Sequence, residues 1–442
     1  MNTFSDLFVS YRRDVSPVAG QYLNGLMQGG TRKNMERMEE AVPDSDHQSL
    51  HQFISNSTWD SQSVMDRIAE EATSIFENKS DSCLLIDESS FAKKGDKSVG
   101  VARQWLGCLG KVDNGQVGVF GSLCTGQHNV LIDGRLYLPI EWVDDKERCL
   151  KAKVPEEKIV FKTKDEIALE VVAHARDLGL SFGWVGADAG YGKGLSFCLE
   201  LEASKETFVV DIHSNQQIFE EEPVPYLPRA TGKGRKPTLY KTDEKSMRVD
   251  KWALAQPAST WQRKTLRVGT KGTVTYEYLS KQVWVWKKGS DEVRLWHLIV
   301  RRDPESCSDY KYSFSNAPKN TSLKRLAFMQ GQRYWIERSF EDGKNECGMA
   351  DYQVRGWVGW HHHMALVMLA MLFMMEERIH NKKEHPLLSC SDIEMLLSHF
   401  LPRRDTTKQE VIRQMKERHR RRQAAMESAA RKKVKKRKKV PG

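Results

Sequence analysis

Two short apolar runs that each end in an aspartate constrain the fold of this chain most. Residues 83–86 precede Asp87, and residues 184–187 precede Asp188 in a glycine-rich turn. Residues 163–179 come before the second run; they open with a capping box and carry apolar side chains at helical spacing. Helix, strand, turn and helix in succession indicate an α/β fold. A carboxylate at the carboxyl end of a buried strand is held rigidly beside solvent, which suits a metal ligand or a catalytic group.

Composition limits the class of protein. The chain has 442 residues, of which 39% are hydrophobic, enough for a large core and two or three domains. Its eight cysteines form no CxxC pair, which argues against a zinc ribbon or a disulfide framework and favours a reducing cytoplasm. The longest apolar run, residues 364–375, is shorter than the roughly 20 residues that a bilayer requires, so it predicts a buried helix. The first residues lack an apolar signal-peptide core, and we expect no secretion.

Positive charge is concentrated near the end of the sequence. The formal net charge is +10, and RKKVKKRKK at residues 431–439 has eight bases in nine positions. Such a block either binds a polyanion or stays disordered as a solvated tail. Charge alone leaves both interpretations open.

The pattern of residues changes four times along the chain. Residues 1–78 show helical periodicity and 79–217 the α/β pattern, whereas 218–318 contain a basic, proline-rich loop followed by alternating β-like runs. Two helices are expected in 319–400, at residues 321–348 and 361–381, and a basic tail in 401–442. The sequence therefore predicts five segments.

A third charged element lies in the first of those two helices. At 100° per residue, Arg333, Glu337, Glu341 and Lys344 share one face, beside an apolar face. Taken alone, this pattern is also typical of ion pairs on the surface of a helix. Either aspartate alone could likewise be a turn or cap residue.

The combination resembles the DDE transposases of bacterial insertion sequences, in the branch with the Y-x2-R-x3-E-x6-K signature. The register matches at Arg333, Ile336, Glu337 and Lys344, while Gln330 stands where the signature has tyrosine. DESSFAKKGDKSVGVARQWLG and GADAGYG look like the two aspartate motifs of this family. NMERM, WDSQSV and VRGWVGWHHHMAL extend the resemblance over most of the chain.

The resemblance implies an RNase H-like catalytic core in two parts, residues 79–217 and 319–400, interrupted by a β-rich insertion at 218–318. It makes Asp87, Asp188 and Glu337 the catalytic ligands of two Mg²⁺ ions, which Mn²⁺ can replace, because hard cations prefer carboxylate oxygens. Arg333 and Lys344 would contact DNA phosphate. Glu341 is the alternative third ligand, but only Glu337 has the arginine and lysine at the right offsets.

The function implied is transposition. The protein would bind the terminal inverted repeats of its own element through its helical N-terminal domain (1–78) and basic tail (401–442), cleave there, and join the 3′ ends to target DNA. Two ends must be brought together, which implies a homo-oligomer, at least a dimer. A bacterial cytoplasmic, nucleoid-associated protein without a membrane partner is expected. An RNase H-like endonuclease without strand transfer and a catalytically silent DNA-binding descendant remain alternatives, although the presence of all three acids argues against the second.

Overall fold

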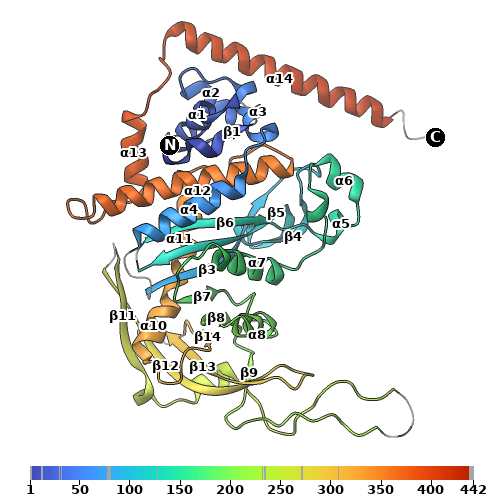
Figure 1. Ribbon diagram of the computed structural model, residues 1–442, viewed down its shortest axis with the longest axis vertical. Coiled ribbons are helices and arrows are strands. Elements are labelled where there is room, and N and C mark those ends of the chain that lie inside the picture. The colour runs from blue at the N-terminus through green and yellow to red at the C-terminus, as the bar shows by residue number, and fades with distance from the viewer. Residues whose placement is uncertain are drawn as a thin grey trace.

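A computed structural model describes residues 2–437 except 11–12, 29, 31, 77–80, 127, 231, 233–234, 270–271 and 307. Within these residues one ten-stranded sheet runs through the middle of the molecule (Figure 1). From one edge its strands are β11 (Gln262–Gly269), β12 (Gly272–Trp286), β13 (Val293–Arg302), β14 (Lys311–Ser315), β8 (Phe208–Ile212), β7 (Trp184–Ala187), β3 (Ser82–Ala92), β5 (Lys111–Thr125) and β4 (Ala102–Leu106), and β6 (His128–Leu136) also pairs with β5.

Five of these strands form an RNase H-like core. In the spatial order β6, β5, β3, β7, β8, the first three are antiparallel neighbours, and β3, β7 and β8 are parallel. Parallel neighbours need a long crossover, and here helices supply it: α7 (Lys164–Asp177) precedes β7, and α8 (Ser196–Ala203) connects β7 to β8. The expected capping box at Thr163 and Glu166 starts α7. The predicted fold class is therefore confirmed.

The four longer strands of residues 218–318, β11 to β14, extend this core sheet, while β10 (Met247–Arg248) pairs with β9 (Gln217–Ile218) in a separate two-stranded sheet. Strand β14 pairs antiparallel with β8, and β13, β12 and β11 follow outward from it. The same stretch also contains a short helix, α9 (Val249–Leu254), which the alternating pattern did not indicate. The β-rich stretch is thus joined to the core by a continuous hydrogen-bonded ladder.

Helices cover the other end of the sheet. Within the described residues, four α-helices precede β3: α1 (Ser16–Met27), α2 (Met35–Ala41), α3 (His47–Asn56) and α4 (Ser61–Ile75). Helices α1, α3 and α4 pack against α12 (Trp357–His380), and both α4 and α12 contact β6 of the sheet (Figure 1). The remaining helices and short strands are η1 (Asn2–Phe8), β1 (Val9–Ser10), β2 (Arg13–Asp14), η3 (Gly107–Leu109), α5 (Ile140–Val143), α6 (Lys146–Lys151), η4 (Glu156–Lys158), η5 (Ala258–Thr260), α10 (Leu323–Gln332), α11 (Tyr334–Glu346), α13 (Cys390–Phe400) and α14 (Lys408–Arg437).

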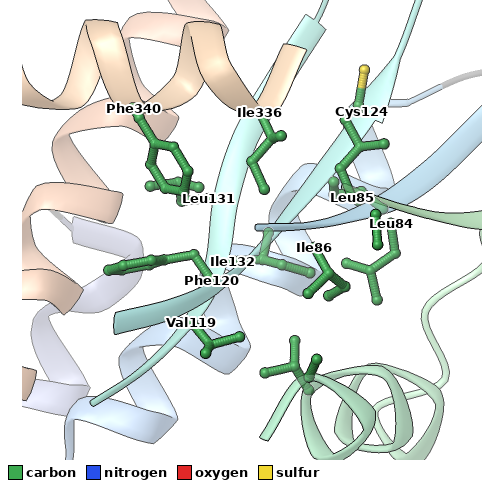
Figure 2. Close-up of a cluster of buried hydrophobic side chains, with 14 of the residues drawn as sticks. Leu84, Leu85, Ile86, Val119, Phe120, Cys124, Leu131, Ile132, Ile336 and Phe340 are labelled. Carbon is green, nitrogen blue, oxygen red and sulfur yellow. The ribbon is translucent and has the colours of Figure 1, made fainter. Parts of the chain in front are cut away.

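The apolar runs of the sequence meet in one core. Figure 2 shows side chains of β3 and β5 together with Ile336 and Phe340 of α11. The rings of Phe120 and Phe340 lie 5.5 Å apart, edge to face. Because Ile336 is fully buried here, its neighbour Glu337 is directed to the side of the helix that borders this core. Packing of α11 thus fixes the orientation of its charged face.

Helix α12 is a core helix. Among the described residues it is the one helix long and apolar enough to cross a membrane, yet 83% of its most apolar 18-residue window is buried inside the protein. The predicted buried helix at residues 364–375 is therefore confirmed. Two of its histidines, His362 and His363, are also buried.

Two local predictions were wrong. The helix expected at residues 321–348 is two helices, α10 and α11, which meet at Arg333. Asp87 was expected at the end of a strand but lies within β3, because β3 continues to pair with β5 as far as Ala92. In the basic tail, the described residues form α14, and Arg418 and Arg421 pair with Glu40 and Glu39 of α2. The side chains of the basic block from residue 432 onward lie outside the described residues.

Candidate active site

Three aspartates stand at equivalent positions on three adjacent parallel strands. Ile86 of β3 is paired with Ala187 of β7, and Ala187 with Val210 of β8. The next residue of each strand is acidic: Asp87, Asp188 and Asp211. Neighbouring strands lie about 4.8 Å apart, so these three positions form a row across the sheet. We call Asp87, Asp188 and Asp211 the aspartate row.

Asp87 is held in a poorly solvated position. Burial raises its pKa to about 7, the negative charge of Asp188 adds to the rise, and the positive charge of Arg333 opposes it. Its Oδ1 accepts a hydrogen bond of 2.7 Å from the backbone N–H of Glu88. Two carboxylates this close repel each other, so the pair has a high affinity for positive charge.

The turn after β7 fixes Asp188. Its Oδ1 accepts a hydrogen bond of 2.9 Å from the backbone N–H of Gly190. Two residues further on, a Cβ at Gly192 would lie 2.1 Å from the backbone oxygen of Asp211. Only glycine permits so close an approach. The glycine-rich turn therefore packs directly onto β8 beside the aspartate row.

Arg333 connects the aspartate row to α11. Its Nε lies 2.9 Å from Oδ2 of Asp211, its Nη2 donates a hydrogen bond of 2.5 Å to Oε1 of Glu337, and its Nη1 lies 3.7 Å from Oδ2 of Asp87. The guanidinium is largely buried, and desolvation opposes the favourable effect of these carboxylates on its charge. One buried cation thus brings Glu337 to the aspartate row.

Glu337 and Glu341 face different partners. Glu337 contacts Arg333 and is half exposed, with 53% of its side chain accessible. Glu341 lies 3.0 Å from Arg338, which also binds Asp342 at 2.6 Å. Of the two candidates for the third acid, the one tied by Arg333 to Asp87 is Glu337.

Lys344 lies at the other end of this face of α11. Its Nζ is 5.8 Å from the ring centres of both Phe91 and Phe340. Burial lowers the pKa of Lys344, and the charge of Asp87 opposes that shift. The ammonium group therefore sits in the field of Asp87. The structure brings all five predicted site residues, Asp87, Asp188, Arg333, Glu337 and Lys344, to one region.

Two charged groups of this region were not predicted. Asp211 is an acid inside an otherwise apolar strand, FVVDI, and Ser313 of β14 donates a hydrogen bond of 2.5 Å to it. Lys164 at the start of α7 forms an ion pair with Glu88, the residue after Asp87. The isolated acid in an apolar run was the signal available for Asp211.

The carboxylates of Asp87 and Asp188 are ligands of the kind that a hard divalent cation prefers. Asp87 and Asp188 offer carboxylate oxygens, and their mutual repulsion is relieved by positive charge. In the described part of the chain, however, no three His, Cys, Asp or Glu side chains are close enough together to hold a metal ion. The cation that now neutralises Glu337 and Asp87 is Arg333. Glu337 must therefore turn away from Arg333 to complete a metal site, and its exposure leaves it free to do so.

Two comparisons with known proteins bear on the family of this chain. The family model described as "DDE superfamily endonuclease" matches residues 4–273, a stretch that includes Asp87 and Asp188. A protein of Microchaete diplosiphon, described as a probable transposase for insertion sequence element IS701, is 27% identical over 342 residues, which is 76% of each chain.

Proposed function

The chain belongs to the DDE superfamily of endonucleases, and we propose that it is the transposase of an insertion sequence, which binds the ends of its element, cleaves there and joins the 3′ ends to target DNA. The observation that carries the proposal is that Asp87 and Asp188 directly follow the paired residues Ile86 and Ala187, with Arg333 linking Glu337 to Asp87. Similarity to a probable transposase over three quarters of both chains supports the same function.

Asp87, Asp188 and Glu337 are the proposed ligands of two Mg²⁺ ions, with Mn²⁺ as a substitute. Bound ions of this kind activate a water molecule or a 3′-hydroxyl and stabilise the leaving oxygen at phosphorus. The protein contributes a rigid pair, Asp87 and Asp188, and a mobile third acid. Rigidity follows from the strand pairing and the Asp188–Gly190 hydrogen bond.

Two cations of the chain would act on DNA itself. When Glu337 leaves Arg333, the guanidinium remains bound to Asp211 through Nε and presents its other N–H groups toward the reacting phosphate. Lys344 offers an ammonium group on the same face of α11, in the field of Asp87. Each would hold a phosphate oxygen near the cut and orient it for in-line displacement.

Transposition requires two element ends in one complex. We propose a homo-oligomer, at least a dimer, for that reason. The helical region at residues 1–78 and the basic tail at 401–442 are the proposed DNA-binding parts outside the core. Some arginines of α14 already form ion pairs with glutamates of α2. The other basic residues of α14 are therefore the ones that we propose bind DNA.

Cleavage and joining of a labelled duplex that carries the element's ends tests this function. With Mg²⁺ the wild type is expected to yield cleaved and joined products, EDTA is expected to abolish them, and Ca²⁺ is expected to support binding without cutting. Asp188→Asn and Glu337→Gln should bind DNA without chemistry, whereas Glu341→Gln should remain active.

The outcomes separate the competing functions. Cleavage without joined product would identify an endonuclease that lacks strand transfer. Binding without any cleavage would identify a silent DNA-binding protein. Normal cleavage by Asp188→Asn would refute the proposed metal site.

A further inference from the structure

A groove lies between the N-terminal helices and the catalytic core, and we propose that it holds the phosphate backbone of the element-end duplex about six base pairs from the cut. The inference rests on the proposed function and specifies where the DNA runs. The groove is lined by α3, by the segment after β3, by the segment after α6, and by residues 352–356.

Its charge fits a polyanion. Five of its lining residues are cations, Lys93, Lys94, Lys151, Lys153 and Arg355, and one is an acid, Glu36. Hydroxyl, amide and imidazole groups of α3 complete the wall that faces them. Evenly distributed cations with small polar donors between them are typical of contacts to a nucleic acid backbone, which carry no sequence preference.

The two walls of the groove are joined. Lys153 on the core side donates a hydrogen bond of 2.7 Å to Oδ1 of Asn56 in α3. Lys93 lies over the ring of Tyr352, with its Nζ 3.4 Å from the ring centre. Lys94 and Arg355 are exposed along the groove. Lys93 and Lys153 are thus held by the fold, while Lys94 and Arg355 are exposed to meet a duplex.

Strand β3 leads from the groove to the active site. Side chains alternate along a strand, so Asp87, Ser89, Phe91 and Lys93 project to the same side. The backbone N–H of Lys93 still donates to the oxygen of Asn114, at 3.0 Å, so the extended conformation reaches this residue. Lys344 lies over Phe91 on this side. Positive groups therefore continue from the aspartate row into the groove.

The ring of Phe91 also contacts that of Tyr352, at 5.6 Å, edge to face. Rings at Phe91 and Tyr352 thus connect the ammonium groups of Lys344 and Lys93. Both rings are buried, so the two ammonium groups are linked through the core beneath the surface.

The length of β3 sets the distance along the DNA between the cut and the phosphates in the groove. Six residues separate Asp87 from Lys93, and at about 3.3 Å per residue they span ~20 Å. A duplex advances about 3.4 Å per base pair, so the same distance corresponds to roughly six base pairs. Phosphates in the groove should therefore lie about six base pairs from the scissile phosphate.

Salt-dependent binding tests the groove. The probe is a labelled 40-base-pair duplex of the element's end, bound to full-length protein with Ca²⁺ over a series of KCl concentrations. Lys94→Gln/Arg355→Gln is expected to lower the slope of log Kd against log[KCl] by about two, since each lost phosphate contact removes about one counterion. The control Lys245→Gln/Lys288→Gln removes two exposed lysines of the β-rich stretch, whose strands form the far edge of the sheet.

Equal changes in slope for the two double variants would overturn the assignment to this groove. So would an unchanged slope for Lys94→Gln/Arg355→Gln in a protein whose circular dichroism matches the wild type. Binding is measured without chemistry, so the result does not depend on the catalytic proposal.

A phosphate-ethylation interference map identifies which phosphates of the duplex the groove contacts. Ethylation about six base pairs from the cleavage site should weaken binding of the wild type and have a smaller effect on Lys94→Gln/Arg355→Gln. Interference confined to other positions would overturn the proposed path. If ethylation about six base pairs inside the end of the element weakens binding but the wild type never cleaves, the groove stands and the transposase function fails. If the wild type cleaves and joins but this position shows no interference, only the groove fails.

Discussion

Asp211 and Arg333 form an ion pair, with Nε 2.9 Å from Oδ2, that ties strand β8 to the junction between α10 and α11. Asp211 is buried and the guanidinium is largely buried, so each provides the other's main charge compensation. Burial raises the pKa of Asp211, and Arg333 opposes the rise. The pair therefore positions the residue that holds Glu337.

Replacing this carboxylate is expected to impair both stability and cleavage. Asp211→Asn keeps the shape of the side chain but leaves Arg333 without its buried counter-charge, which should lower the free energy of unfolding by about 1–3 kcal/mol. Urea unfolding measures that loss. Cleavage should fall at least about tenfold, equivalent to ~1.4 kcal/mol, in a binding-competent protein. Ser313→Ala removes the other hydrogen bond to Asp211 and serves as the control; an equal loss of cleavage in both variants would argue against a role for Arg333.

A methyl group at Gly192 is expected to displace the turn that carries Asp188. Its Cβ would lie 2.1 Å from the backbone oxygen of Asp211, so the turn or β8 must move. We expect Gly192→Ala to cost about 1–3 kcal/mol of unfolding free energy and to reduce cleavage. Gly107→Ala is the control, because nothing lies within 4 Å of a Cβ built there. A wild-type melting temperature for Gly192→Ala would contradict the close approach.

The buried imidazole of His363 predicts a loss of stability in weak acid. Its Nδ1 lies 2.9 Å from the hydroxyl of Tyr22 and its Nε2 3.2 Å from the oxygen of Gly348, so the neutral ring is satisfied on both sides. Burial lowers the pKa of His363 to about 3, although the hydrogen bond to Gly348 opposes the shift. The unfolded chain binds the proton first, near pH 6.5. The contribution of His363 is complete above that pH and declines toward pH 3, by up to ~1.4 kcal/mol per unit.

Urea unfolding at pH 7.5, 6.5 and 5.5 measures this dependence. His363→Gln cannot titrate in this range and should show a shallower decline than the wild type. Parallel declines in the two proteins would assign the acid sensitivity to other groups.

Local patterns predict that Asp87 and Asp188 follow buried strand segments, although they do not show that β3 continues past Asp87 to Ala92. Each follows an apolar run of strand length, and the helix before the second run carries its own start signal at Thr163 and Glu166. These patterns depend on neighbouring residues alone, so they can be recognised without knowledge of the tertiary fold. The strand ladder then brings the two acids together.

Asp211 and the helix junction could not be predicted in the same way. Asp211, the single acid in FVVDI, is important because it binds Arg333. Arg333 is distant in sequence, and only folding brings the two residues together. Arg333 itself keeps right-handed helical dihedrals, φ −54° and ψ −27°, and arginine favours helices. The local signal that the sequence offers is Gly331, a weak helix former two residues before the junction.

A displacement of the outer strands β12 and β13 can be transmitted to the aspartate row through hydrogen bonds. Backbone hydrogen bonds connect β12 to β13, β13 to β14, and β14 to β8, and Ser313 passes displacement on to the Asp211 carboxylate. A ladder of this kind resists sliding far better than a flexible joint would. A bound molecule that bends the β12–β13 hairpin would thus alter the spacing between β8 and the start of α11. That change would alter the contacts of Arg333, whose guanidinium holds Glu337.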